Sequence, residues 1–211
     1  LCAHPVPDAM LHSVRFRNVT AADLALPVRG PAHVIEMVPY QIVTRHVVEE
    51  VPARDGFFTP DSTYTKLCVV ERHGRGGGIA VCPLKGYGIT GGAIATSVAH
   101  DSHNVIAAGD NDADLVLAIN HLKTIGGGYV LAAGGRIQGA LPLPLGGLMS
   151  TEPWETIQAG AEAILTQAKA MGIPYPVDPF TSLSFLALPV IPELRLTDRG
   201  LFDVTAFAPV E

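Results

Sequence analysis

The sequence is 211 residues long, 48% hydrophobic and 16% charged, with a formal net charge of −6 at pH 7. This length predicts one large domain or two small ones with a sizeable core. The mean hydropathy of +0.31 is high, so we expect other protein to cover part of the surface. No apolar run approaches the roughly 20 residues of a membrane-spanning helix, and no basic cluster suits nucleic acid. Membrane and nucleic-acid binding are therefore set aside.

The cysteines and the first residues indicate the cellular setting. Cys2, Cys68 and Cys82 are odd in number and widely separated, which argues against a disulfide framework. We therefore expect a reducing, cytoplasmic environment. The first residues contain no signal-peptide pattern. The sequence starts at leucine rather than methionine, and we expect it to be a piece of something longer.

The first half of the chain reads as an irregular segment followed by strands. Residues 1–30 are polar and interrupted by proline, and we interpret them as an N-terminal tail or linker before one domain at 31–211. β-Branched residues then indicate successive strands. The glycines at 74–78 join the third predicted strand to the fourth. The predicted strands are 33–38, 42–48, 65–71, 78–84 and 93–99.

A first helix is predicted to begin near Asp110, with Asp110 or Asn111 as its cap. Glycines at 126–128 end this helix, because glycine accepts the left-handed backbone that follows a helix. A hairpin follows, with strands at 129–133 and 136–141 joined by Gly134 and Gly135.

A second helix has Pro153 near its first position and Ser150 or Thr151 as its cap, and Gly172 with Pro174 stops it. Strands before and between the helices, with hairpins as well as crossovers, predict the fold class. We expect an α/β fold of mixed α+β layers, with a mostly antiparallel or mixed sheet and two main helices.

The densest polar cluster is His100, Asp101, Ser102, His103 and Asn104, between two apolar runs. Two histidines three positions apart can share a metal or flank a substrate, and the aspartate can be a third ligand or orient an imidazole. The alternative is a polar turn whose side chains cap backbone groups. Spacing alone leaves the two interpretations even.

Three further motifs have plainer interpretations. Residues 86–91 match G-x-G-x-x-G, but no strong helix follows, so tight turns and close packing are preferred to a phosphate site. The apolar, proline-rich segment 141–150 lines a cavity or interface, or is a buried connector, which we prefer. Glu71-Arg72-His73 is a charged strand end that we expect to be solvated, or else to face a partner domain.

No complete catalytic apparatus is present in the sequence. It contains no H-x-H or H-E-x-x-H metal motif, no cytidine-deaminase signature and no G-x-S-x-G elbow. Any chemistry at residues 100–104 therefore depends on groups from elsewhere.

Several long motifs, in register over about residues 30 to 205, resemble the C-terminal part of bacterial adenine deaminases. They are KLCVVERH (66–73), KGYG (85–88), GAIATSVAHDSHN (92–104), ND (111–112), LPLPLGGLMS (141–150) and LSFLALPVIPEL (183–194). The resemblance implies a role in purine salvage, in the hydrolysis of adenine to hypoxanthine and ammonia. It also implies an amidohydrolase barrel as a partner domain, with a binuclear manganese or iron site, and a homo-oligomer.

The resemblance suggests that this region alone is inactive, because the barrel carries most of the metal-binding histidines. We expect His100, Asp101 and His103 to support catalysis at the mouth of the active site, and Ser102 and Asn104 to contact the substrate. No metal ligand is assigned to this chain. A scaffold that drives oligomerisation and a purine-binding module without hydrolysis are the competing functions.

Overall fold

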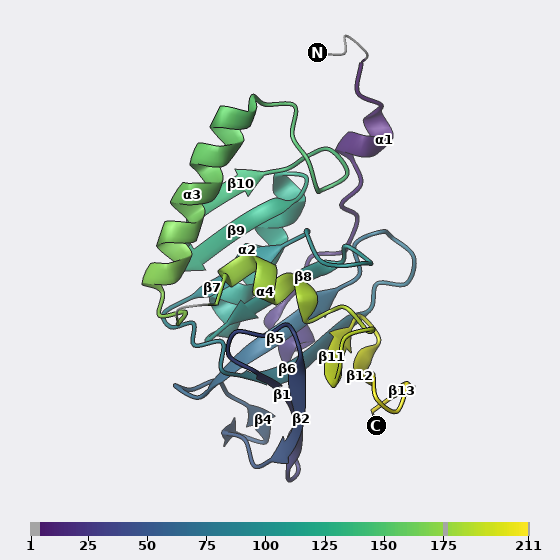
Figure 1. The fold of residues 1–211 in the computed structure, drawn as a ribbon, viewed down its shortest axis with the longest axis vertical. Helices are drawn as coiled ribbons and strands as arrows, with labels where there is room; N and C mark the ends of the chain where they lie inside the picture. Colours follow the sequence, from purple (N-terminus) through teal and green to yellow (C-terminus); the bar gives the residue numbers. More distant parts are fainter. Residues whose placement is uncertain (1–4, 175–176, 211) are drawn as a thin grey trace.

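The computed structural model describes residues 5–174 and 177–210, so Cys2 lies outside the described residues. At its centre is an eight-stranded sheet with strand order β10-β9-β7-β8-β5-β6-β1-β2 (Figure 1). Neighbours pair antiparallel except β1 and β6, which are parallel. The prediction of a mixed sheet is confirmed. Its strands are β1 (Ala32–Met37), β2 (Thr44–Glu49), β5 (Tyr64–Val70), β6 (Ile79–Lys85), β7 (Ala93–Thr96), β8 (Val105–Gly109), β9 (Gly128–Ala133) and β10 (Arg136–Pro142).

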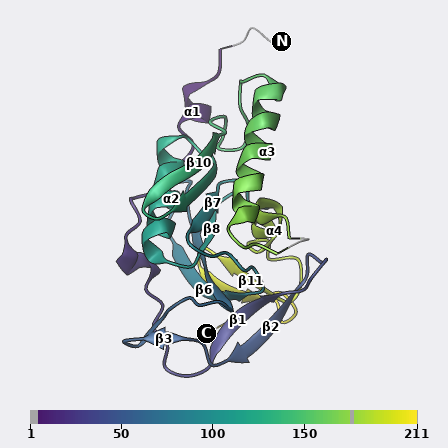
Figure 2. The same ribbon diagram turned by 90° about the vertical axis from the view of Figure 1, so that its left-hand side faces the viewer.

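Helices cover both faces of this sheet. The helix α2 (Asp112–Thr124) lies on one face, and α3 (Trp154–Ala170) and α4 (Pro179–Phe185) lie on the other (Figure 2). Because each face is covered, the central strand β5 is buried along nearly its whole length, and its second half, Leu67 to Val70, is a continuous apolar run. Leu67 and Val69 face α3 and α4, whereas Cys68 and Val70 face α2.

Two small sheets complete the structure. β3 (Ala53–Arg54) pairs with β4 (Phe57–Phe58), and the C-terminal sheet joins β11 (Leu194–Thr197), β12 (Gly200–Asp203) and β13 (Ala208–Pro209). A tight turn at Asp198 and Arg199 joins β11 to β12. Within the described ranges no helix is both long and apolar enough to cross a membrane.

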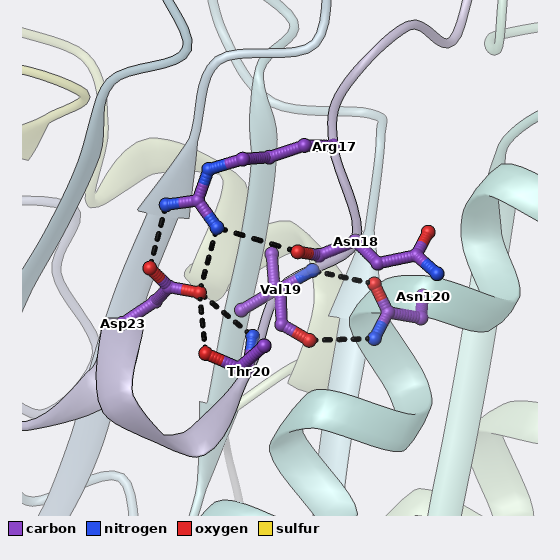
Figure 3. Close-up of polar contacts among 6 residues, drawn as sticks. All are labelled: Arg17, Asn18, Val19, Thr20, Asp23 and Asn120. Carbon is purple, nitrogen blue, oxygen red and sulfur yellow. Dashed lines mark hydrogen bonds and ion pairs between the residues drawn. The ribbon is translucent and has the colours of Figure 1, made fainter.

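The segment before β1 contains α1 (Asp8–Leu11) and the 3-10 helix η1 (Ala21–Leu24), with irregular backbone between them. It is attached to α2 through the Asn120 amide, which accepts from the Val19 N–H and donates to the Val19 carbonyl, each at 2.9 Å (Figure 3). Val19 and Leu24 are buried in the core on the α2 side. The domain boundary at residue 30 stays a prediction.

Local signals placed helices α2 and α3 and the strands of the large sheet other than β8. Asn111 caps α2 by accepting the Asp114 N–H at 2.8 Å, and Gly126 has the positive φ that ends it. Gly134 and Gly135 both have positive φ in the β9–β10 hairpin, as predicted.

Some local predictions are wrong. Pro153, rather than Ser150 or Thr151, is the N-cap of α3, and no side chain caps it. The strand expected at 93–99 ends at Thr96, because Ser97 uses its side chain to hold two glycine segments together. Its hydroxyl donates to the Gly147 carbonyl and accepts the Gly128 N–H.

The two described cysteines are free and fully buried. They lie on adjacent strands but on opposite faces of the sheet. Burial raises the pKa of the Cys68 thiol to about 12 and raises that of Cys82 as well. Both therefore act as small apolar core residues.

Candidate functional site

Residues 100–104 form an exposed loop between β7 and β8. The side chains of His100 and Asp101 are 46% and 84% exposed. Asn104, by contrast, is buried. The loop therefore presents its first residues to the surface and anchors itself by its last.

The backbone of this loop is held at several points. The His103 N–H donates to the Ala99 carbonyl at 2.7 Å. The Ser102 carbonyl lies 2.7 Å from His73 Nε2, and the His103 carbonyl accepts from the Nε of Arg72. The turn is thus fixed by its main-chain groups, which leaves the exposed side chains free for other partners.

Arg72 is the main anchor, and its environment corrects the prediction of a solvated strand end. The residue is 1% exposed. Besides the His103 carbonyl, it reaches the Gly146 carbonyl at 3.0 Å and the Ser13 hydroxyl at 3.5 Å. Among the described residues no carboxylate pairs with it, and burial lowers its pKa. A buried guanidinium that binds carbonyl oxygens joins three segments that are distant in the sequence.

Glu71 is also buried rather than solvated, with 6% exposure. Its Oε2 accepts the backbone N–H groups of Arg75, Gly76 and Gly77 at 3.0–3.2 Å, and its Oε1 accepts that of His73. Burial alone would raise the pKa of Glu71, but these four hydrogen bonds outweigh burial and lower it. The carboxylate shapes the glycine-rich loop between β5 and β6.

Ser102 and Asn104 line an open groove of about 550 Å³ beside this loop. The Asn104 amide donates to Asp198 in the β11–β12 turn at 3.1 Å. Its carbonyl oxygen accepts the Arg72 backbone N–H at 3.4 Å. The other residues lining the groove are Glu71, His73, Arg75, Gly76, Gly78, Asp198 and Arg199.

The two histidines of the loop lie side by side, with ring centroids 5.9 Å apart. His100 also stacks on Phe185 at the end of α4, at 5.2 Å and 22°. Burial lowers the pKa of His103, and the nearby positive charges of Arg72 and His100 lower it further. His103 Nδ1 is buried and has no hydrogen-bond partner in the described structure. His103 is therefore a neutral imidazole with an unused polar atom.

The described residues do not fit the metal site that the resemblance implies. They contain no group of three or more histidine, cysteine, aspartate or glutamate side chains able to hold a metal ion. Asp101 turns its carboxylate toward His100 Nδ1 at 3.8 Å and is otherwise exposed. The Arg72 guanidinium beside His103 would repel a cation. No step through a metal is therefore derived from these side chains.

The structure thus divides the candidate residues into two groups that face different surroundings. Ser102 and Asn104 face the groove, whereas His100 and His103 stand beside Phe185. Sequence reasoning missed the importance of Glu71 and Arg72. The available signal was that these two charged residues directly follow a buried apolar strand, where a side chain has little access to water.

The G-x-G-x-x-G motif at 86–91 packs tightly rather than forming a cradle. A Cβ at Gly88 would lie 2.9 Å from Pro174 Cδ, and Tyr87 is fully buried. No helix starts at the motif. This geometry favours the interpretation of tight turns and close packing.

Comparison with known proteins matches residues 41–208 to the family model described as the adenine deaminase C-terminal domain. The chain is 44% identical to an adenine deaminase of Halalkalibacterium halodurans over 209 residues, which is 97% of this chain and 36% of the relative. An adenine deaminase of Leuconostoc citreum is 48% identical over 90% of this chain and 34% of the relative. One of Dehalococcoides mccartyi is 47% identical over 96% of this chain and 36% of the relative. The chain therefore spans about a third of the curated relatives it matches.

Proposed function

Because the chain belongs to the adenine deaminase C-terminal domain family, we propose that it serves the metal-dependent conversion of adenine and water into hypoxanthine and ammonia. It acts there as one domain of a larger enzyme and is inactive alone. The relatives are named adenine deaminases and are about three times as long as the matched segment. This length leaves room for a separate catalytic domain.

The partner in this proposal is an amidohydrolase barrel that holds the manganese or iron. The enzyme works in purine salvage in the cytoplasm, as a homo-oligomer. The described residues of the present chain supply no ligand set for the metal, so its chemistry is left to the barrel.

One observation carries the role of loop 100–104: its backbone is fixed while the titratable side chains of His100 and Asp101 stay exposed. A turn that serves only structure uses its side chains to satisfy its own backbone. Ser102 does so, because its hydroxyl accepts the Asn104 N–H at 3.4 Å. Arg72 and His73 satisfy the loop carbonyls, however, and the side chains of His100 and Asp101 make no hydrogen bond within the described structure. Preorganised groups of this kind suit an active site.

In the proposal, the loop closes the mouth of the barrel over adenine. His100, Asp101 and His103 orient the purine or exchange a proton with its ring nitrogens, and Ser102 and Asn104 contact its edge. The lowered pKa of His103 keeps it neutral at pH 7, so it can donate or accept a hydrogen bond. These are supporting roles, since the hydrolysis itself depends on the barrel.

The test is alanine substitution of His100 and of His103 in the full-length enzyme. We expect deaminase turnover to fall with the metal content unchanged. A further variant, His121→Ala on α2, is the control, because that side chain makes no hydrogen bond in the described structure and lies away from the loop. Unchanged deamination in the His100 and His103 variants would reject the role of the loop.

A scaffold function has its own support in the exposed large apolar side chains. Tyr40 is 79% exposed, Trp154 is 69% exposed and Phe207 is 76% exposed. A scaffold predicts that the histidine substitutions lower stability or change the subunit number while turnover per folded enzyme stays the same. Calorimetric titration of the isolated chain with adenine separates both functions from a purine-binding module, which alone would release heat on binding.

A further inference from the structure

Arg72 joins residue 13, the loop 145–149 and the loop 100–104. We give the name Arg72 face to these segments together with α1, which precedes residue 13, and Trp154 at the start of α3, which follows the loop 145–149. Figures 1 and 2 both place α1 and the start of α3 at the same end of the molecule. Arg72 connects the loops beneath them through Ser13, Gly146 and His103.

The backbone of the loop 145–149 is as firmly held as that of the loop 100–104. Leu145 and Met149 exchange backbone hydrogen bonds at 2.9 and 3.1 Å, and the Gly146 N–H donates to the Met10 carbonyl at 2.8 Å. The Gly147 carbonyl accepts the Ser97 hydroxyl. A Cβ at Gly147 would lie 2.9 Å from a nitrogen of the Arg72 guanidinium, so only glycine lets this loop cover the arginine. The loop is therefore rigid.

This rigid backbone holds apolar side chains out into solvent. Met149 is 56% exposed, Trp154 is 69% exposed and Met10 is 38% exposed. Large apolar side chains gathered on an ordered backbone are typical of a surface that another protein covers. The buried-connector interpretation of 141–150 holds for Leu141 and Leu143, which are buried, but not for the exposed Met149.

We propose that the Arg72 face is the surface on which the catalytic domain of an adenine deaminase docks. The inference rests on the proposed function and names the interface it requires. About two thirds of each relative lies outside the matched segment, and the family model is that of the C-terminal domain. In such a relative the rest of the polypeptide enters along the segment that corresponds to residues 5–15, and this segment lies on the Arg72 face.

The position of the loop 100–104 supports the same occupant. A domain docked on Met10, Met149 and Trp154 reaches the exposed His100 and Asp101, because Arg72 binds the two loops at once. A second exposed apolar pair, Tyr40 and Ile42, shares neither the Arg72 contacts nor the entry segment. That pair therefore provides a matched control surface.

The experiment compares the isolated chain with a chimera in which it replaces the matching segment of the Halalkalibacterium halodurans adenine deaminase. Backbone hydrogen exchange is measured in both. We expect exchange within 99–104 and 145–154 to be about tenfold slower in the chimera, because the catalytic domain covers these segments. Exchange around Tyr40 and Ile42 stays the same.

Two double variants of the chimera sharpen the test. Met149→Lys with Trp154→Lys is expected to remove the added protection, whereas the similarly exposed pair Tyr40→Lys with Ile42→Lys leaves it intact. Protection at Tyr40 and Ile42 instead would overturn the inference. So would protection of 145–154 in the isolated chain, linked to dimer formation in sedimentation, because a second copy would then be the occupant.

The deaminase assay keeps this inference separate from the proposed function. A chimera that shows the protection but hydrolyses no adenine supports the docking surface and counts against the catalytic role. A chimera that hydrolyses adenine without protection of 145–154 rejects the docking surface alone.

Discussion

The strand β5 has a buried cation near each end, and the two are partnered in different ways. Lys66 is 2% exposed and forms an ion pair with Asp112 at 2.6 Å, with a further hydrogen bond to the Leu24 carbonyl at 3.0 Å. Arg72, just past the other end, is 1% exposed and binds two carbonyl oxygens and a hydroxyl.

This difference separates a structural contact from a candidate functional one. The charge of Lys66 is neutralised within the fold, where it attaches the N-terminal segment to the start of α2. The charge of Arg72 is not neutralised by any described carboxylate. Burial lowers the pKa of His103 in the loop that Arg72 holds, and the positive charge of Arg72 lowers it further. The same type of burial thus serves stability at one end of the strand and presentation of side chains at the other.

The largest effect is expected from Arg72→Met. The substitution leaves the partly buried His103 and Gly146 carbonyls without donors, which costs about 3 kcal/mol of unfolding free energy. Urea unfolding of the isolated chain measures it, and hydrogen exchange in the loop 100–104 should rise strongly. A loss below about 1 kcal/mol would show that the loop does not depend on this arginine.

Lys66→Met is expected to cost less, about 2 kcal/mol. Asp112 loses its partner, but its side chain is 35% exposed, so water can solvate the freed carboxylate. Urea unfolding gives the cost. Hydrogen exchange at 100–104 should stay as in the unsubstituted chain. Faster exchange there would contradict the inference that only Arg72, and not Lys66, holds this loop.

A smaller effect is expected from the carboxylate next to Arg72. The pKa of Glu71 is lowered below its ordinary value of 4.5 in the folded chain, so its contribution to stability is complete above that value. The contribution is lost as the pH falls through the folded pKa. Unfolding free energies measured from pH 6 down to pH 3 should fall more steeply for the unsubstituted chain than for Glu71→Gln. Equal slopes would mean that the four backbone hydrogen bonds do not favour the ionised form.

The smallest effect on stability is expected from a substitution at the exposed surface of the loop 100–104. Asp101→Ala removes a side chain that is 84% exposed, so the unfolding free energy should change by no more than about 0.5 kcal/mol. Thermal unfolding checks this. A larger loss would assign the loop to structure and would support the scaffold function.

Local sequence patterns determined the regular part of this protein. The apolar run of β5, the Asn111 cap of α2 and the glycine pair of the β9–β10 hairpin all depend on neighbours within a few residues. The cluster at 100–104 was recognisable for the same reason, since five polar residues interrupt an apolar stretch. The helix α4 was missed because it has only seven residues, too few for a clear helical period.

Only the tertiary structure decided which charges are buried and what they hold. The carbonyls that receive the Arg72 guanidinium belong to residues 31 and 74 positions away in the chain, and Asn104 meets Asp198 across 94 positions. The sequence predicts that the Glu-Arg-His group at the end of a strand is solvated, because most charged side chains are. Burial of these charges becomes favourable only when carbonyl and amide groups from distant parts of the chain bind them. The sequence alone therefore located the polar loop, and long-range packing decided which of its groups are fixed and which stay exposed.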